Sequence, residues 1–248
     1  MVKIPDDAQV WTETTPYGKV FLRKYSAFAM IKIYRCVQAV APSVIPHLLE
    51  YYHFVQPLSE EDLLARLQLL GYPDNIYVAG LNEGSNVGQN FIAVTQYGGP
   101  TLIPVAKRLK ENGQLRELLV LVRALGACLG TLHAVGLICD DSHAEQYVAD
   151  ESLVVRRIDV HQSRVRMDIV PGHPIFGGMN ESFFENRRLT VKGFEVGVRN
   201  ELRQITRLPA YLDEECFANE EAMRECKEGY LAAGGTTEGW ESAAQDDA

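Results

Sequence analysis

The chain lacks any uninterrupted apolar run of the roughly 18 residues that a membrane-spanning helix needs. Its start, Met1-Val-Lys-Ile-Pro-Asp-Asp, also lacks the charged-then-apolar order of a signal peptide. The five cysteines are odd in number and none stand in C-x-x-C spacing, which disfavours both a disulfide framework and a zinc site. These absences predict a protein of the cytoplasm or nucleus with reduced thiols and no membrane partner. The cysteines are Cys36, Cys128, Cys139, Cys216 and Cys226.

Basic charge is also scarce. The 248 residues carry 33 acidic and 24 basic side chains, a net charge of −9. The imbalance lies at the C-terminal end, where residues 200–248 hold twelve acids and four bases. Binding to nucleic acid needs clustered Lys and Arg to neutralise phosphates, so a general nucleic-acid partner is disfavoured.

What is present is a normal apolar fraction, 46%, arranged in two zones of different pattern. Up to about residue 98, runs rich in β-branched and aromatic residues predict strands, with one helix opening at Pro57. Beyond a Gly-Gly-Pro break near Gly98–Thr101, three- and four-residue apolar spacing predicts mainly helices. We therefore expect an α+β protein with two lobes, residues 1–98 and 99–235, and a disordered acidic tail, 236–248. The predicted strands are 19–25, 28–34, 76–80 and 91–95, with a hairpin over 146–160, and the predicted helices are 59–70, 114–133, 198–212 and 219–233.

Four charged residues stand at places that suggest chemistry. Lys32 falls in a predicted strand, Glu60 in the first turn of the helix that follows, Asp141 after a buried helix, and Asp159 at a strand end. Each has an ordinary structural interpretation, since acids favour helix starts and loop aspartates commonly cap turns. Their order along the chain carries more information than any one of them.

That order resembles the protein kinase superfamily over about residues 11–212. Ala29-Met-Ile-Lys32 is similar to the strand motif V-A-I-K, and Glu60 takes the place of its ion-pairing glutamate. Leu132-His-Ala-Val-Gly-Leu-Ile-Cys-Asp-Asp141 is similar to the segment that ends in H-R-D, and Ile158-Asp159-Val-His takes the place of D-F-G. The segment 91–99 is similar to the strand that runs into the kinase hinge.

The resemblance implies a bilobal kinase-like fold that binds ATP and Mg²⁺ between its lobes and acts on a protein substrate or a small molecule. Lys32 would hold the nucleotide phosphates and Glu60 would orient Lys32. Asp141 would accept the proton of the attacking hydroxyl, and Asp159 with Gln146 would bind the metal. The residues implied around the nucleotide itself are Gly18, Thr95 as gatekeeper, Gln96 and Gly98.

The departures from the kinase pattern lie at residues that handle phosphate. Glu13 and Thr15 occupy two of the three glycine positions of the phosphate-covering loop, and only Gly18 remains. Cys139 replaces the histidine of H-R-D, Gln146 an asparagine, and His161 the glycine of D-F-G. Two readings therefore stay open beside an active atypical kinase: a pseudokinase that serves as a binding or scaffold module, and an unrelated α+β protein.

One finer resemblance concerns Asp141-Ser-His143. A histidine two residues after the catalytic aspartate is typical of haspin-like kinases and aminoglycoside phosphotransferases, and Tyr97-Gly-Gly-Pro-Thr-Leu is similar to the segment after the haspin hinge. The equally supported alternative is that His143 bonds a backbone carbonyl.

Overall fold

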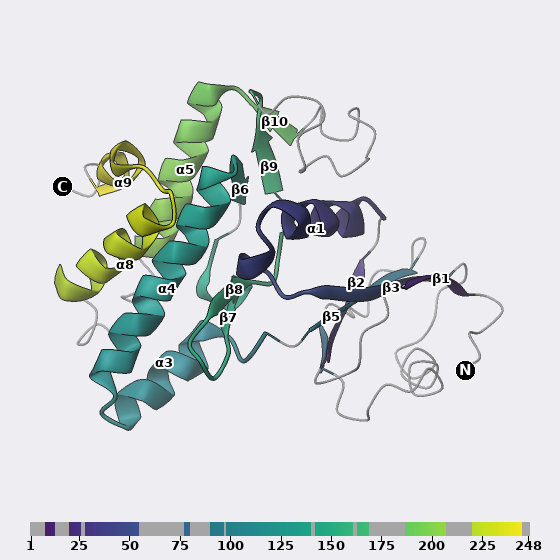
Figure 1. Ribbon diagram of the computed structural model, residues 1–248, viewed down its shortest axis with the longest axis horizontal. Coiled ribbons are helices and arrows are strands. Elements are labelled where there is room, and N and C mark those ends of the chain that lie inside the picture. The colour runs from purple at the N-terminus through teal and green to yellow at the C-terminus, as the bar shows by residue number, and fades with distance from the viewer. Residues whose placement is uncertain are drawn as a thin grey trace.

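The computed structural model describes residues 8–12, 20–25, 28–54, 77–79, 90–96, 98–139, 142–160, 163–168, 187–206 and 220–244. Sheet and helix are separated in space, with the largest sheet on one side and the long helices on the other (Figure 1). The strands are β1 (Ala8–Thr12), β2 (Val20–Tyr25), β3 (Leu48–Phe54), β4 (Tyr77–Ala79), β5 (Asn90–Gln96), β6 (Leu137–Cys139), β7 (Tyr147–Ala149), β8 (Val155–Arg157), β9 (Ser163–Arg166) and β10 (Arg188–Leu189). The helices are α1 (Phe28–Val40), α3 (Leu102–Glu111), α4 (Leu115–Ala134), α5 (Val191–Thr206), α8 (Glu220–Ala232) and α9 (Thr237–Ala244), with short 3-10 turns η1 (Pro42–Val44) and η2 (Ala144–Gln146).

The largest sheet has five strands in the order β1-β3-β5-β2-β4. Strand β5 is central and antiparallel to both β3 and β2, while β4 pairs parallel with β2. The β-branched and aromatic segments at 19–25, 76–80 and 91–95 were predicted as strands, and the sheet confirms all three. Mixed α+β architecture is thus confirmed.

The strand predicted over 28–34 is wrong, because these residues form helix α1. The buried side chains Tyr34 and Val37 of α1, and Ala41 directly after it, recur at three- and four-residue steps, which is helical spacing. The hydroxyl of Tyr34 donates to the carbonyl of Pro46 at 2.5 Å, and Gln38 Oε1 accepts from the amide of Leu48 at 2.7 Å. These bonds fix α1 against the chain that leads into β3, so Lys32 lies on a helix.

The Gly-Gly-Pro crossover between sheet and helices is closely packed. A Cβ on Gly99 (φ +110°) would lie 1.9 Å from the carbonyl oxygen of Ala149, and one on Gly98 would lie 2.7 Å from Val148. The carbonyl of Pro100 accepts from the amide of Ala149 at 3.0 Å. Glycine is therefore required at Gly99 both by its dihedral angle and by the close approach of β7.

The helical half is built on α4, the long helix expected over 114–133. Its buried residues include glycines that allow α8 to approach backbone to backbone: a Cβ on Gly126 would lie 2.0 Å from the carbonyl oxygen of Cys226, and one on Gly130 would lie 2.2 Å from that of Tyr230. The predicted hairpin is also confirmed, since β7 and β8 pair antiparallel. Strands β10, β9 and β6 form a third, small sheet.

The acidic tail was expected to be disordered from residue 236, but residues 237–244 form helix α9. Trp240 and Ala243 are buried there, and the indole of Trp240 lies 5.7 Å from the ring of Tyr230 on α8. Burial of an aromatic side chain stabilises the helix in a way that its small, polar sequence does not indicate.

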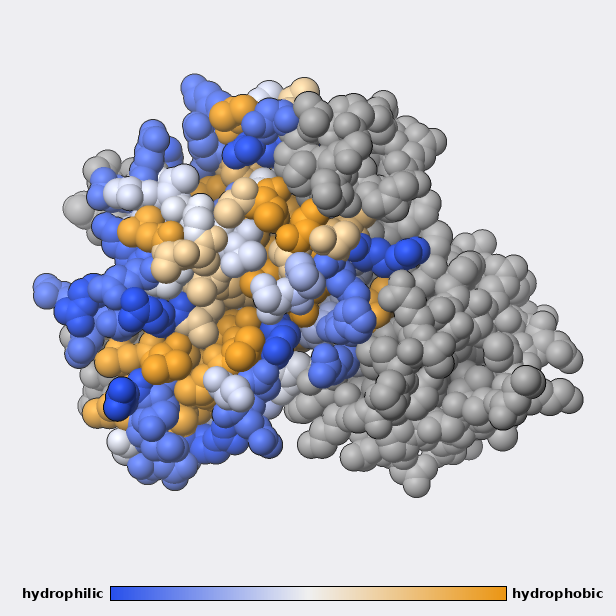
Figure 2. All heavy atoms as spheres, viewed as in Figure 1, coloured by the Kyte–Doolittle hydropathy of each residue, from blue (hydrophilic) through white to orange (hydrophobic). Residues whose placement is uncertain are grey.

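The surface of the helical half is mixed. Figure 2 shows separate apolar patches within a hydrophilic surface on the face in view. Exposed apolar side chains in the described residues include Leu115 and Val120 of α4 and Val191 and Val196 of α5. Scattered apolar residues of this kind are normal for a folded protein. In the described part of the chain, no helix is long and apolar enough to cross a membrane.

Candidate functional site

A buried guanidinium lies at the centre of the helical half. Arg157, the last residue of β8, is only 1% exposed. Its Nη1 lies 2.8 Å from Oε1 of Glu201 and 2.6 Å from the hydroxyl of Tyr147, and its Nε donates to the carbonyl of Asp159 at 2.8 Å. A buried charge is tolerated only when it is paired and hydrogen-bonded, and Arg157 meets both conditions.

The partner carboxylate, Glu201, comes from the middle of α5 and is 2% exposed. Its Oε2 accepts from the ring Nε2 of His133 at 3.0 Å and from the backbone amide of Cys139 at 3.1 Å. Burial alone would raise the pKa of Glu201, but the hydrogen bond from His133 and the charge of Arg157 outweigh burial and hold that pKa below its ordinary value. Glu201 therefore stays ionised inside the protein.

His133 connects this carboxylate to the C-terminal helices. Since a carboxylate can only accept, His133 Nε2 donates, and in the neutral ring Nδ1 accepts from the hydroxyl of Tyr230 at 3.0 Å. Burial raises the pKa of Tyr230 to about 12, so its hydroxyl keeps its proton. The polar network thus runs from β8 through α5 and α4 to α8.

The network binds the two residues that flank positions 140–141. Cys139 precedes these positions and Ser142 follows them, and the positions themselves lie outside the described part of the chain. Glu201 accepts from the Cys139 amide at one end. At the other end, Gln204 Oε1 accepts from the Ser142 amide at 2.8 Å, and the Ser142 hydroxyl contacts both Glu201 and Arg157. Both sequence neighbours of residues 140–141 are therefore hydrogen-bonded to this network.

The same guanidinium links the backbone of Asp159 to Ser142, because Arg157 contacts the Ser142 hydroxyl at 2.6 Å and the Asp159 carbonyl at 2.8 Å. Gln146 belongs to the same neighbourhood: its carbonyl accepts from the amide of Ile158 at 2.9 Å. Nε2 of the Gln146 side chain lies 3.1 Å from Nε2 of His143. The two residues implied as metal ligands, Gln146 and Asp159, are therefore carried by adjacent backbone segments.

Cys139 stands where the kinase resemblance implies the histidine of H-R-D, and its side chain is buried. Its thiol lies 3.1 Å from the hydroxyl of Ser163 on β9. Burial raises the pKa of Cys139 to about 11 and the pKa values of Cys36, Cys128 and Cys226 to about 12. A thiol with so high a pKa is a poor nucleophile at neutral pH.

Of the remaining predicted site residues, some lie in the described part of the chain and others lie outside it. Thr95 is 5% exposed at the end of β5, Gln96 is exposed beside it, and Gly98 is buried against β7. Glu60, Gly18 and Asp141 lie outside the described residues, as do the departures Glu13, Thr15 and His161.

Lys32 lies on α1 and not on the predicted strand, and the sequence of α1 contains no acidic residue. Lys24 is the lysine of β2, the strand that precedes α1 in the chain, and it pairs with Ile92 of β5.

Sequence reasoning missed Arg157, Glu201 and His133. Their only local signal was an acidic residue in α5 one position from Leu202 and four from Ile205, on the buried side of that helix. Glu201 and Arg157 are 44 positions apart and Glu201 and His133 are 68 apart. Pairings over such separations come from the tertiary fold.

Carboxylate and amide oxygens are the donors that Mg²⁺ prefers, which is the chemistry of Asp159 and Gln146. Three or more His, Cys, Asp or Glu side chains are nowhere grouped as a metal site among the residues that the structure describes. No family model matches the chain, and a search of curated proteins returns no match.

Proposed function

We propose that the protein is an atypical kinase-like protein that binds ATP with Mg²⁺ between its sheet and its helical half and transfers the γ-phosphate to a hydroxyl. Protein Ser or Thr is the leading acceptor class and a small molecule is the second. The bilobal kinase-like arrangement is part of the same proposal.

One observation carries the proposal: the Arg157–Glu201 network fixes Cys139 and Ser142, which flank residues 140–141 in the sequence, and also the backbone of Asp159. Phosphoryl transfer is catalysed mainly by positioning and by neutralising charge. A buried ionic network suits that task, because its members are held in place by several hydrogen bonds each.

In this proposal each side chain has a separate role. Asp159 and Gln146 supply oxygen ligands for Mg²⁺, which neutralises phosphate charge when bound. Asp141 accepts the proton of the attacking hydroxyl. The strand lysine beside the phosphates is reassigned to Lys24, since Lys32 is on α1.

The second candidate is a pseudokinase that acts as a binding or scaffold module. The sequence of α1 favours it. Active kinases pair the strand lysine with a glutamate on a neighbouring helix, and α1, which follows β2 directly, has no Asp or Glu. Glu60 remains the predicted partner.

Calorimetric titration of the full chain with ATP, with and without Mg²⁺, tests the proposal. We expect binding that Mg²⁺ strengthens, and we expect Asp159→Asn to abolish the Mg²⁺ effect, because an amide offers oxygen but no charge. Asp168→Asn is the matched control: Asp168 is a half-exposed residue whose contact is the surface pair with Arg166 at 2.5 Å.

Turnover separates the two candidates. Asp141→Asn should leave ATP affinity within about twofold and lower phosphate transfer by about 10²–10⁴-fold. ATP binding with no transfer to any tested protein or small-molecule hydroxyl favours the pseudokinase. Absence of ATP binding in the wild-type chain refutes both.

A further inference from the structure

A cavity lies where the end of α4 meets α5, the turn after α8, and α9. Its volume is about 280 Å³, just below the usual range for ligand sites. Phe194, Val198 and Tyr230 give it an apolar lining. Its lining also includes Gly234, Gly235, Thr236 and Gly239.

The cavity contains a polar group without a partner. Arg199 of α5 lines it, and Nε of Arg199 is buried with no hydrogen-bond partner among the described residues. A buried donor left without an acceptor costs roughly 1–3 kcal/mol, and more when the group is charged. Such an atom at the wall of a cavity is what a bound acceptor would satisfy.

Neighbouring donors are already used. The Arg166 guanidinium also lines the cavity, but its Nε donates to Asp168 at 2.5 Å and its Cζ lies 5.5 Å from the ring centre of Phe194. The hydroxyl of Thr236 accepts from the amide of Gly239 at 3.1 Å and so caps the start of α9. Arg199 is left as the anchor for an anion.

The other charges limit the anion to a single charge. Glu195 and Glu238 line the same cavity as the two arginines, so its formal charges balance. Glu195 and Glu238 would repel a phosphate dianion about twice as strongly as a single carboxylate, so a monoanion is the better partner for Arg199. The apolar wall requires that the rest of the ligand be apolar as well.

We propose that this cavity binds a small organic monocarboxylate, with its carboxylate at Nε of Arg199 and its apolar body against Phe194, Val198 and Tyr230. The cavity shares His133 and Tyr230 with the Arg157–Glu201 network, but the proposed ligand contacts neither Arg157 nor Glu201. The site requires neither ATP nor a metal ion.

Binding of phenylacetate to the full chain, measured by calorimetry and by ligand-observed NMR, tests this site. For a ligand of this size we expect a Kd on the order of 1 mM. Phenylacetamide has the same shape without the charge and should bind at least about tenfold more weakly, as a charge-assisted hydrogen bond is lost. Inorganic phosphate should show no competition.

Two variants locate the ligand. Arg199→Gln should weaken phenylacetate about tenfold or more without loss of thermal stability, since it removes an unsatisfied buried donor. Lys192→Gln is the control, because Lys192 is an exposed cation of the same helix that does not line the cavity. If Arg199→Gln fails to fold, Ala134→Leu, which adds volume at the cavity wall, should block binding instead.

Three results would overturn the proposal. They are no saturable binding of phenylacetate, benzoate or hexanoate at about tenfold above the expected Kd, equal binding of phenylacetamide, and unchanged binding in the Arg199 variant.

Discussion

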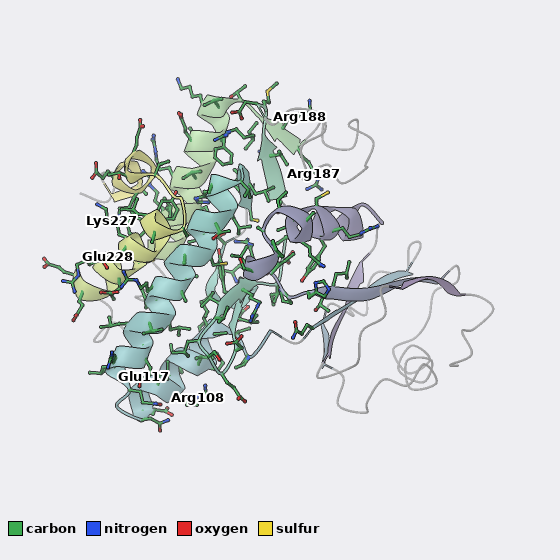
Figure 3. The ribbon with its side chains drawn as sticks, viewed as in Figure 1. Arg108, Glu117, Arg187, Arg188, Lys227 and Glu228 are labelled. Carbon is green, nitrogen blue, oxygen red and sulfur yellow. The ribbon has the colours of Figure 1, made fainter. Side chains whose placement is uncertain are left out.

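Two arginine–glutamate systems on α4, α5, α8 and β8 have the same chemistry and opposite surroundings. In the interior, Arg157 lies 2.8 Å from Glu201, and their side chains are 1% and 2% exposed. On the surface, Arg123 of α4 lies 2.9 Å from Glu225 and 2.7 Å from Glu228 of α8, with Arg123 49% exposed. Glu228 is at the outer side of α8 in Figure 3. The effect of these ion pairs on folding stability is therefore decided by their exposure to solvent and not by their distances.

The difference also separates two roles. The surface pairs join two helices that are already in contact through Gly126, Gly130 and Gly229. The buried pair joins β8 to α5 and fixes the flanks of residues 140–141. We expect substitutions in the interior to change folding stability strongly and those at the surface to change it little.

The largest effect should come from Glu201→Ala. It leaves the Arg157 charge buried without its counter-ion and the Cys139 amide and His133 without an acceptor, which should cost about 3–5 kcal/mol of unfolding free energy. Urea denaturation measures it. The control Glu228→Ala should stay within about 0.5 kcal/mol, and equal losses in the two variants would contradict the comparison.

A smaller loss is expected for Gly126→Ala, which tests whether backbone packing or the surface ion pairs hold α8. Alanine is the better helix former by about 0.5–1 kcal/mol. The added Cβ would nevertheless lie 2.0 Å from the Cys226 carbonyl oxygen, so overpacking should cost a net 1–3 kcal/mol.

Gly193→Ala in α5 is the control for that experiment, measured by the same denaturation. Its Cβ would lie 3.2 Å from the Thr190 hydroxyl and 3.8 Å from the Leu189 side chain, with no backbone atom among these contacts. We expect no loss there. A stabilised Gly126→Ala protein would show that the helices can separate at no cost.

The next effect in size should be a loss of unfolding free energy at acid pH, where the buried Glu201 becomes protonated. The pKa of Glu201 is lower when folded than when unfolded, so its contribution is complete above the unfolded value, about 4.3, and is lost as the pH falls through the folded value. The fall in unfolding free energy between about pH 5 and pH 3 should be shallower in Glu201→Gln than in the wild type. Parallel slopes would mean that the pKa of Glu201 is the same in the folded and the unfolded protein.

The smallest effect should be that of Arg123→Gln, about 0.2–1 kcal/mol, because an exposed pair gains little from its charge. The difference from the wild type should disappear at about 1 M NaCl, where charges are screened within about 3 Å. Thermal denaturation at low and high salt measures it. A larger, salt-independent loss would mean that the arginine stem contributes through packing.

Elements with a local sequence pattern were predicted, and elements that depend on distant contacts were not. The long helix α4, the β7–β8 hairpin and strands β2, β4 and β5 were predicted because each has a local pattern. Helix α1 was assigned as a strand because Ile31, Ile33 and Tyr34 suggest β-structure, and only contacts with Pro46 and Leu48 reveal which side is buried. Helix α9 was missed because Trp240 is buried by residues of α8 that are not its chain neighbours.

By itself, the sequence determined an α+β protein, and it predicted Asp141 as a base and Gln146 and Asp159 as metal ligands. Only the tertiary structure decided that Lys32 is on a helix, that Arg157 pairs with Glu201, and that Arg157 binds both Ser142 and the backbone of Asp159. Periodicity and residue type act over a few positions, so a sequence displays them directly. The choice of which buried charge meets which counter-ion is made when distant segments pack, because the cost of burying either charge alone forces the pairing.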